Sequence, residues 1–241
     1  MAATHLTTLV WGVGGAEHAA AAGVGTAVVV DVLSFSTTVT VAADLGVEVL
    51  PHAWTSSAAA HALSHGATLA RGRHQAGPGE VSLSPVSLRL ASGLHRLVLP
   101  SPNGSTICAA LDEEEVEVAV GCLRNATAAG RWLAAADVPG VVVAAGERWT
   151  DGGLRPALED LLGAGAVLAA AADAGAVLDA DARAAVAAYD EARSDLGDRV
   201  RACPSGVELS GTGFAADVEV ALELDASPRV PVLDDGVFAA P

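Results

Sequence analysis

The segment SPNGST, residues Ser101–Thr106, has the residue types of an anion-binding turn. Its Asn-Gly pair tolerates a positive φ, so the backbone can turn back and present N–H groups at the start of a following helix. Free N–H groups at a helix start bind anions, although a capped turn without a ligand explains the same residues. The candidate anion-binding residues of this turn are Asn103, Gly104, Ser105 and Thr106.

A second set of hydroxyl groups, Ser36-Thr37-Thr38, lies at the start of another predicted helix, shortly after Asp31. Asp31 ends a buried strand, where a carboxylate needs a partner, either a helix N-terminus or a metal ion. Neither segment is a Walker loop, because the chain has no lysine and no G-x-x-x-x-G-K pattern.

Two further carboxylates, Glu159 and Asp160, lie near the start of a helix that Pro156 opens. Acidic residues in a first helical turn complement the helix dipole, which explains them without a ligand. They are also the hard oxygen donors that Mg²⁺ prefers, and phosphoryl chemistry commonly uses such ligands. Both interpretations stay open on the sequence alone.

Polar residues also follow the other predicted strands. Arg71 and Arg73 follow the third strand, Asn125 follows the fifth and Glu147 follows the sixth. Ligands of open α/β sheets bind beyond the carboxyl ends of the strands, so polar groups that converge there indicate a site. Because loops are polar in any protein, the same pattern also has an explanation without a ligand.

The elements that position these residues alternate between β-branched runs and alanine-rich helical stretches. We predict strands over 26–31, 47–51, 68–71, 96–100, 116–121 and 140–145, and helices over about 36–45, 56–65, 126–136, 156–174, 181–202 and 214–224, with one more from about 106. The strands are continuous apolar runs, which is typical of a sheet buried on both faces. The alternation predicts a three-layer α/β/α fold with a mostly parallel sheet. We expect a single unit over residues 1–241, with a C-terminal appendage over about 203–241.

The composition excludes several classes of protein. There are 29 acidic and 13 basic residues, and the net charge is -16. Nucleic-acid binding and attachment to an anionic membrane both need positive charge, so we expect neither partner. The longest apolar stretches are too short, or too interrupted by polar residues, to cross a bilayer. No basic stretch precedes an apolar run at the N-terminus, and the three cysteines are few and far apart, so we expect a cytoplasmic protein with buried thiols.

Five segments, in the same order along the chain, resemble segments of the 2-phosphosulfolactate phosphatase (ComB-like) family. They are VVVDVLSFSTTV at 28–39, SPNGST at 101–106, GCLRNA at 121–126, LEDLLGAGAVL at 158–168, and GFAADVEVALELD at 213–225, which VPVL follows. The resemblance implies an α/β phosphatase that depends on Mg²⁺ and removes phosphate from 2-phospho-3-sulfolactate in coenzyme M synthesis. It places the following residues at the active edge: Asp31, Thr37, Thr38, Asn103, Gly104, Thr106, Asn125, Glu159 and Asp160.

Two departures from the family pattern bear on the substrate. Ser34 stands where the family has an arginine, whose fork would suit a phosphate or a sulfonate. Ser82-Leu83-Ser84-Pro85 replaces a GNSP segment, so the asparagine is missing. Arg71 and Arg73 are the residues that would restore positive charge.

We therefore predict a Mg²⁺-dependent phosphatase in which water attacks the phosphorus of a small anionic phosphoester in line. Asp31, Glu159 and Asp160 would hold the metal, and Glu147 is the candidate general base. The predicted phosphate-binding residues are Thr37, Thr38, Asn103, Gly104, Ser105, Thr106, Asn125 and Arg71. The alternatives are an anion-binding protein of the same fold without turnover, and a phosphatase of a different phosphoester. The sequence is compatible with a homodimer.

Overall fold

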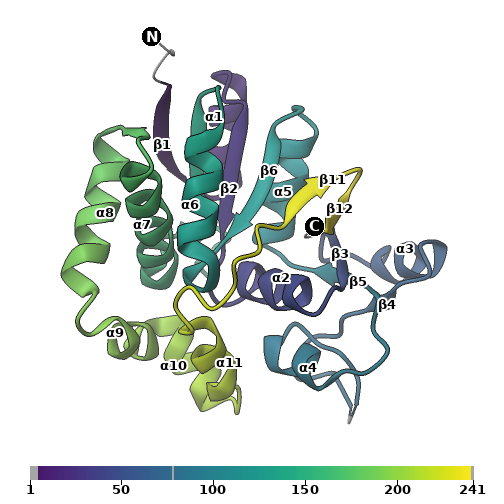
Figure 1. The fold of residues 1–241 in the computed structure, drawn as a ribbon. Coiled ribbons are helices and arrows are strands. Elements are labelled where there is room, and N and C mark those ends of the chain that lie inside the picture. Colours follow the sequence, from purple (N-terminus) through teal and green to yellow (C-terminus); the bar gives the residue numbers. More distant parts are fainter. Residues whose placement is uncertain (1–4, 78, 240–241) are drawn as a thin grey trace.

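The computed structural model describes residues 5–77 and 79–239, which form an α/β fold around one large, mostly parallel sheet (Figure 1). The strand order across the sheet is β10-β1-β7-β2-β6-β11-β12-β3-β5-β4. The strands are β1 (Leu6–Trp11), β2 (Thr26–Val30), β3 (Glu48–His52), β4 (Thr68–Leu69), β5 (Arg96–Pro100), β6 (Glu117–Gly121), β7 (Gly140–Ala144), β10 (Val177–Leu178), β11 (Val232–Asp234) and β12 (Val237–Ala239).

Helices cover both faces of this sheet, so the predicted three-layer arrangement is confirmed. One face packs against α6, α7 and α8, while α1, α2, α4 and α5 contribute to the core on the other face. The helices are α1 (Gly12–Ala21), α2 (Phe35–Asp44), α3 (Ala58–Ser64), α4 (Pro85–Leu90), α5 (Gly104–Asp112), α6 (Ala126–Ala135), α7 (Leu158–Asp173), α8 (Ala180–Ala192), α9 (Leu196–Ala202), α10 (Pro204–Gly211) and α11 (Ala215–Ala221). No helix in the described ranges is long and apolar enough to cross a membrane.

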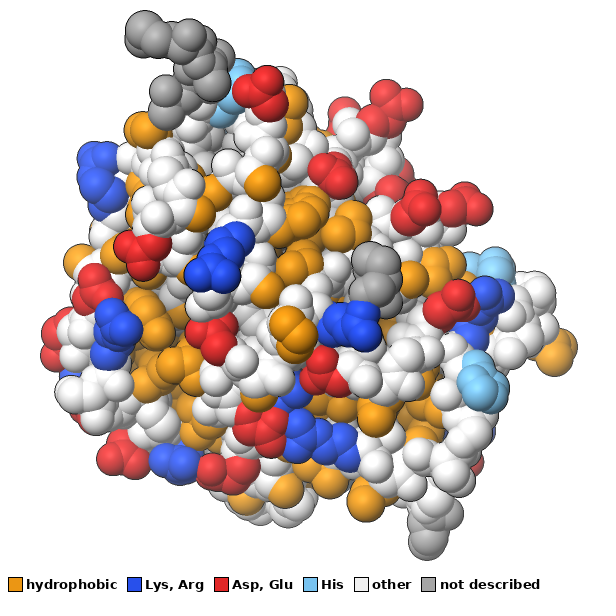
Figure 2. All heavy atoms as spheres, in the orientation of Figure 1, with side chains coloured by type: hydrophobic (Ala, Val, Ile, Leu, Met, Phe, Trp, Pro, Cys, Tyr) orange, Lys and Arg blue, Asp and Glu red, His pale blue; other side chains and the backbone are white. Residues whose placement is uncertain are grey.

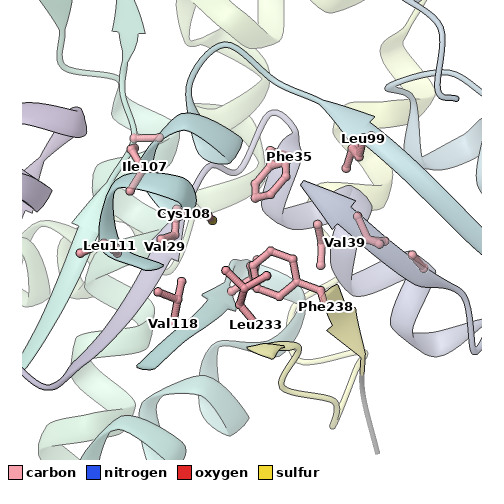
Figure 3. Packing of buried hydrophobic residues seen from close by; sticks show 14 of the residues in the cluster. Val29, Phe35, Val39, Leu99, Ile107, Cys108, Leu111, Val118, Leu233 and Phe238 are labelled. Atoms are coloured by element: carbon pink, nitrogen blue, oxygen red, sulfur yellow. The ribbon is translucent and has the colours of Figure 1, made fainter. Parts of the chain in front are cut away.

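The central strands are apolar throughout because each one faces a hydrophobic core on both sides. In β2, Ala27 and Val29 belong to one core, and Val28 and Val30 belong to the other. Alternate residues of a strand point to opposite faces of the sheet, so a strand buried on both faces needs no polar position. Figure 3 shows the first of these cores, where Val29 lies among side chains from α2, α5 and the C-terminal strands.

The last two described strands lie inside the sheet. Strands β11 and β12 form an antiparallel hairpin between β6 and β3, with Phe238 opposite Val49. The ring of Phe238 meets that of Phe35 edge to face, with centroids 6.3 Å apart (Figure 3). The hairpin therefore completes the sheet and packs against the helix that follows β2.

Several elements lie outside the predicted pattern. Strand β1 and helix α1 were not predicted, because threonines interrupt the apolar run of β1 and α1 is rich in glycine, a poor helix former. The short helices α4 and α10, whose first residues are Pro85 and Pro204, were not predicted either. The helix predicted over 181–202 is two helices, α8 and α9, with a turn between them.

Charged side chains are unevenly spread over the surface. Figure 2 shows acidic side chains gathered at the upper right, above the turn from α5 to β6, where residues 112–115 are all exposed. This acidic cluster is therefore solvated surface.

The three cysteines are free and buried, as predicted.

The close packing of α7 against α8 depends on Gly165. A Cβ atom at this position would lie 2.3 Å from the carbonyl oxygen of Ala185, closer than any real contact. We expect Gly165→Ala to lower the free energy of unfolding by about 2 kcal/mol or more, because the helices must move apart.

The matched control is Gly14→Ala in α1, where a Cβ meets nothing within 4 Å. Its higher helix propensity should stabilise by about 0.5–1 kcal/mol. Urea unfolding checks both values, and equal effects would contradict the packing argument.

Candidate functional site

A pocket of about 540 Å³ opens at the edge of the sheet where the parallel strands end. Asp31 comes from the loop after β2, Asn103 from the loop after β5, and Glu147 from β8 (Glu147–Arg148), which pairs with β9 (Leu154–Arg155) after β7. The residues around the pocket are Asp31, Leu33, Ser34, Phe35, Thr38, Trp54, Arg73, Leu83, Leu99, Ser101, Pro102, Asn103 and Glu147. The structure therefore brings together polar groups from several strand ends, in the region where ligands of such sheets bind.

The carboxylate of Asp31 lies between the N-termini of two helices. Its Oδ1 accepts a hydrogen bond from Phe35 N at 3.1 Å, and its Oδ2 accepts one from Gly104 N at 3.1 Å. Helices α2 and α5 start at these two residues, so helix N-termini are partners of this buried acid. The Gly104 N–H, predicted to bind an external anion, is thus donated to Asp31.

Gly104 is required for this approach of α5 to α2. A Cβ atom at position 104 would lie 2.2 Å from the ring of Phe35. Any side chain would therefore push the two helix starts apart and would lengthen the hydrogen bond to Asp31. The Asn-Gly pair marked this turn in the sequence, but the structure uses its glycine for close packing.

Burial raises the pKa of Asp31 to about 7, and the negative charge of Glu147 adds to the increase. The two backbone N–H groups oppose this rise only in part. The pKa of Glu147 is also raised, again mainly by burial, although its Oε2 accepts a hydrogen bond from Asn103 Nδ2 at 3.2 Å. Two carboxyl groups with raised pKa values in one pocket are typical of sites that bind cations or transfer protons.

Asp160 holds together the two loops that carry Asp31 and Glu147. Its Oδ1 accepts a hydrogen bond from Val32 N at 2.8 Å, and its Oδ2 accepts one from Gly146 N at 2.8 Å. Both donors are immediate neighbours of the pocket carboxylates. The pKa of Asp160 is raised well above its ordinary value, first by burial and then by Asp31. This contact with other loops goes beyond the helix-dipole role considered from the sequence.

The neighbouring Glu159 lies deeper in the protein. Its side chain is 2% exposed, and its Oε2 has no hydrogen-bond partner within the described part of the chain. Its negative charge raises the pKa of the Cys203 thiol, whose main cause of increase is burial. Neither Glu159 nor Asp160 is among the residues that line the pocket.

The fit of this donor set to Mg²⁺ depends on how many carboxylates can reach one ion. Over residues 5–77 and 79–239, no three His, Cys, Asp or Glu side chains are arranged to hold a metal ion jointly. The metal-binding roles of Asp31, Glu159 and Asp160 stay a prediction. Mg²⁺ commonly uses only one or two carboxylates together with water and substrate phosphate. Asp31 fits this mode, because each of its oxygens accepts one N–H and keeps a further lone pair.

The predicted hydroxyl ligands have different surroundings. Thr38 lines the pocket, and its Oγ1 donates to Leu83 O at 3.2 Å. Thr37 is fully buried, and its Oγ1 donates to Val32 O at 2.7 Å. Both hydroxyl groups therefore bond backbone carbonyls, and Thr38 is the one beside the pocket.

The serine and threonine after Gly104 bond the end of β5 and the loop that follows it. The hydroxyl group of Ser105 donates to Leu99 O at 3.0 Å, and that of Thr106 donates to Pro102 O at 3.1 Å. Thr106 lines an adjacent hollow of about 350 Å³, which shares Asn103 and Glu147 with the main pocket. Their contacts fix the loop shape around Asn103.

Asn125 and Arg71 lie away from the pocket lining. Asn125 is fully buried, accepts a hydrogen bond from Cys122 N and donates to Val120 O and Arg229 O. Its amide group thus holds the start of α6 and the C-terminal segment in place. The Arg71 guanidinium is about half exposed, and its Nε lies 3.9 Å from a carboxylate oxygen of Glu80.

Arg73, two residues later, lines the pocket instead. Its Nε donates to Asp217 Oδ2 at 3.0 Å, and its Nη2 donates to Ser34 Oγ. The sequence analysis named Arg73 as a source of positive charge but selected Arg71 for the site. The signal that favours Arg73 is the GFAADV segment, whose aspartate is the partner that holds it.

The raised pKa of Asp31 predicts a pH-dependent stability. The folded state holds this proton more tightly than the unfolded state, so stability is fully present below about pH 4 and declines as the pH rises to about 7. Each such group contributes up to about 1.4 kcal/mol per pH unit. Urea unfolding of the wild type and of Asp31→Asn, in a buffer with a chelator, checks this between pH 5 and 8. The variant should show a shallower slope, and an equal slope would contradict the assignment.

Comparison with known proteins assigns the chain to a family. The family described as 2-phosphosulpholactate phosphatase matches residues 15–236. A 2-phosphosulfolactate phosphatase from Methanothermobacter thermautotrophicus is 32% identical over 214 residues, which cover 89% of this chain and 89% of the relative. The resemblance inferred from five sequence segments is thereby confirmed. The chain belongs to the 2-phosphosulpholactate phosphatase family and is a phosphoric monoester hydrolase.

Proposed function

We propose that this enzyme hydrolyses 2-phosphosulfolactate to 3-sulfolactate and phosphate, that it depends on Mg²⁺, and that it serves coenzyme M synthesis. The observation that carries the proposal is the pair Asp31 and Glu147 in one pocket at the sheet edge, in a chain of this family. The named activity of the relative from Methanothermobacter thermautotrophicus supports the substrate.

Asp31 would hold the cation in this account. The N–H groups of Phe35 and Gly104 fix its carboxylate before any ligand arrives, so no side-chain reorganisation is needed. No positively charged group is among the causes of its pKa shift, and a cation would offset the repulsion from Glu147 and Glu159. When bound, Mg²⁺ would supply stabilisation of the negative charge on the phosphoryl oxygens.

Glu147 would accept the proton of the attacking water. Burial raises its pKa toward the working pH, which favours a general base near neutrality. The amide of Asn103 donates to Glu147 Oε2 and so orients the carboxylate toward the pocket that both residues line. Positioning of the water and stabilisation of charge would then supply most of the rate, as in other phosphoryl transfers.

The substitution Asp31→Asn tests the proposal directly. We expect kcat for 2-phosphosulfolactate to fall by about 10³-fold or more, because the neutral amide binds the cation poorly. The fold should remain, since the buried charge of Asp31 already costs stability at neutral pH. Phosphate release is measured with millimolar Mg²⁺ and with a chelator, and the wild-type rate should fall to background with the chelator.

The control variant is Asp112→Asn, which makes the same chemical change at an exposed position. It should keep the wild-type rate and the same response to Mg²⁺. Unchanged turnover by Asp31→Asn would overturn the role of Asp31, and release that ignores the chelator would overturn the dependence on Mg²⁺. Release from other phosphoesters, but not from 2-phosphosulfolactate, would overturn the substrate.

A further inference from the structure

Arg73 brings a positive charge to a pocket whose other charged groups are carboxylates. Among the described residues, it is the single arginine that lines this pocket, and the chain has no lysine. Asp31 and Glu147 belong to the loops after β2 and β7, whereas Arg73 follows β4, in another part of the sheet. A substrate that carries an acidic group besides its phosphate would therefore lie between two parts of the pocket. One part has Asp31, Glu147 and the bound cation, and the other has the Arg73 guanidinium.

The Arg73 side chain is held firmly by residues far away in the sequence. Asp217, in the first turn of α11, is 1% exposed and accepts a hydrogen bond from Arg73 Nε at 3.0 Å. The other oxygen of Asp217 accepts a hydrogen bond from Ser84 Oγ, and the Phe214 ring lies 5.8 Å from Arg73 Cζ. A guanidinium that is already fixed loses little side-chain entropy when it binds a ligand.

These contacts occupy one edge of the guanidinium and leave its end unpaired. Nε bonds Asp217, and one N–H of Nη2 bonds Ser34 Oγ. Within the described part of the chain, neither N–H of Nη1 has a partner, and the second N–H of Nη2 also has none. The end of the fork is the geometry that binds a planar carboxylate or two oxygens of a sulfonate with two parallel hydrogen bonds.

We propose that Arg73 binds the second anionic group of the substrate, a carboxylate or a sulfonate, and that Asp217 is the positioning residue that aims it. This inference rests on the proposed function and names the residue that selects among phosphoesters. Arg73 thereby supplies, from the loop after β4, the guanidinium that the family resemblance places at position 34. The short side chain of Ser34 accepts its hydrogen bond at that point.

The test uses four phosphoesters that differ only in the acidic groups they carry besides the phosphate. They are 2-phosphosulfolactate with both a carboxylate and a sulfonate, 2-phospholactate with a carboxylate, the phosphate ester of 2-hydroxyethanesulfonate with a sulfonate, and ethyl phosphate with neither. For Arg73→Ala, we expect KM to rise about 10- to 100-fold for the substrates whose acidic group Arg73 binds. The KM for ethyl phosphate should change less than about threefold, and kcat should stay similar.

Further variants separate binding from structure. Arg73→Lys keeps the charge but loses the planar guanidinium, so it should give an intermediate KM. Added guanidinium ion, below its denaturing range, should partly restore the KM of Arg73→Ala. Asp217→Asn should raise KM for the same substrates by a smaller factor. Because Arg73→Ala leaves the buried Asp217 without its charged partner, the double variant Arg73→Ala/Asp217→Asn provides a foldable alternative. Arg193→Ala, at the residue that follows α8, removes one guanidinium outside the pocket lining and should change neither constant.

Two kinetic results would overturn the inference. An equal loss on all four substrates would assign Arg73 to the phosphoryl group or to folding, and unchanged KM values would deny it a role in binding. A binding measurement separates this inference from the proposed function: 3-sulfolactate should raise the Tm of the wild type but not of Arg73→Ala. That result supports Arg73 even if no phosphate is released, whereas equal shifts in Tm would contradict it.

Discussion

The site depends on buried carboxylates whose oxygens accept hydrogen bonds from backbone N–H groups. Asp31 joins the starts of α2 and α5, and Asp160 joins the loops after β2 and β7. These four N–H groups would otherwise face the protein interior without partners, which would cost free energy at each position. The acids themselves pay a desolvation cost, which is why the pKa values of both are raised. These carboxylates therefore order the loops, and their oxygens can still interact with a charged ligand.

The charge of the whole molecule and the charge of the site have separate consequences. A net charge of -16 disfavours nucleic acid as a partner, since binding its backbone needs a positive footprint. The binding of a small anion depends instead on a few charged groups close to it. In this pocket, those groups would be a cation at Asp31 and the guanidinium of Arg73.

Much of the scaffold was predictable because its physical signals are local. Continuous apolar runs indicated the central strands, and the strand-end rule placed Asp31, Asn103 and Glu147 at one edge, where the structure has them around one pocket. The choice of Arg71 over Arg73 was not settled by local pattern. The direction of the Arg73 side chain depends on α11, which supplies Asp217 from 144 positions further along the chain.

Other predicted site residues lie away from the pocket lining, because the sequence does not show which polar side chains are buried in contacts with the backbone. Asn125 has the residue type of a phosphate ligand, yet its amide bonds the backbone at Cys122, Val120 and Arg229. The C-terminal strands were equally hard to place, since nothing in a short VPVL run says that it pairs with β6. Such long-range pairings follow from tertiary packing, which composition and periodicity do not encode.

Asp160 fixes the two loops that carry the pocket carboxylates, and Asp160→Asn tests this role most directly. The amide keeps one acceptor oxygen and opposes the second N–H, so hydrogen exchange at Val32 or Gly146 should accelerate about tenfold or more. We expect kcat to fall at least about tenfold in the same protein, because Asp31 and Glu147 lose their fixed geometry. Unchanged exchange at both amides together with wild-type turnover would contradict the account.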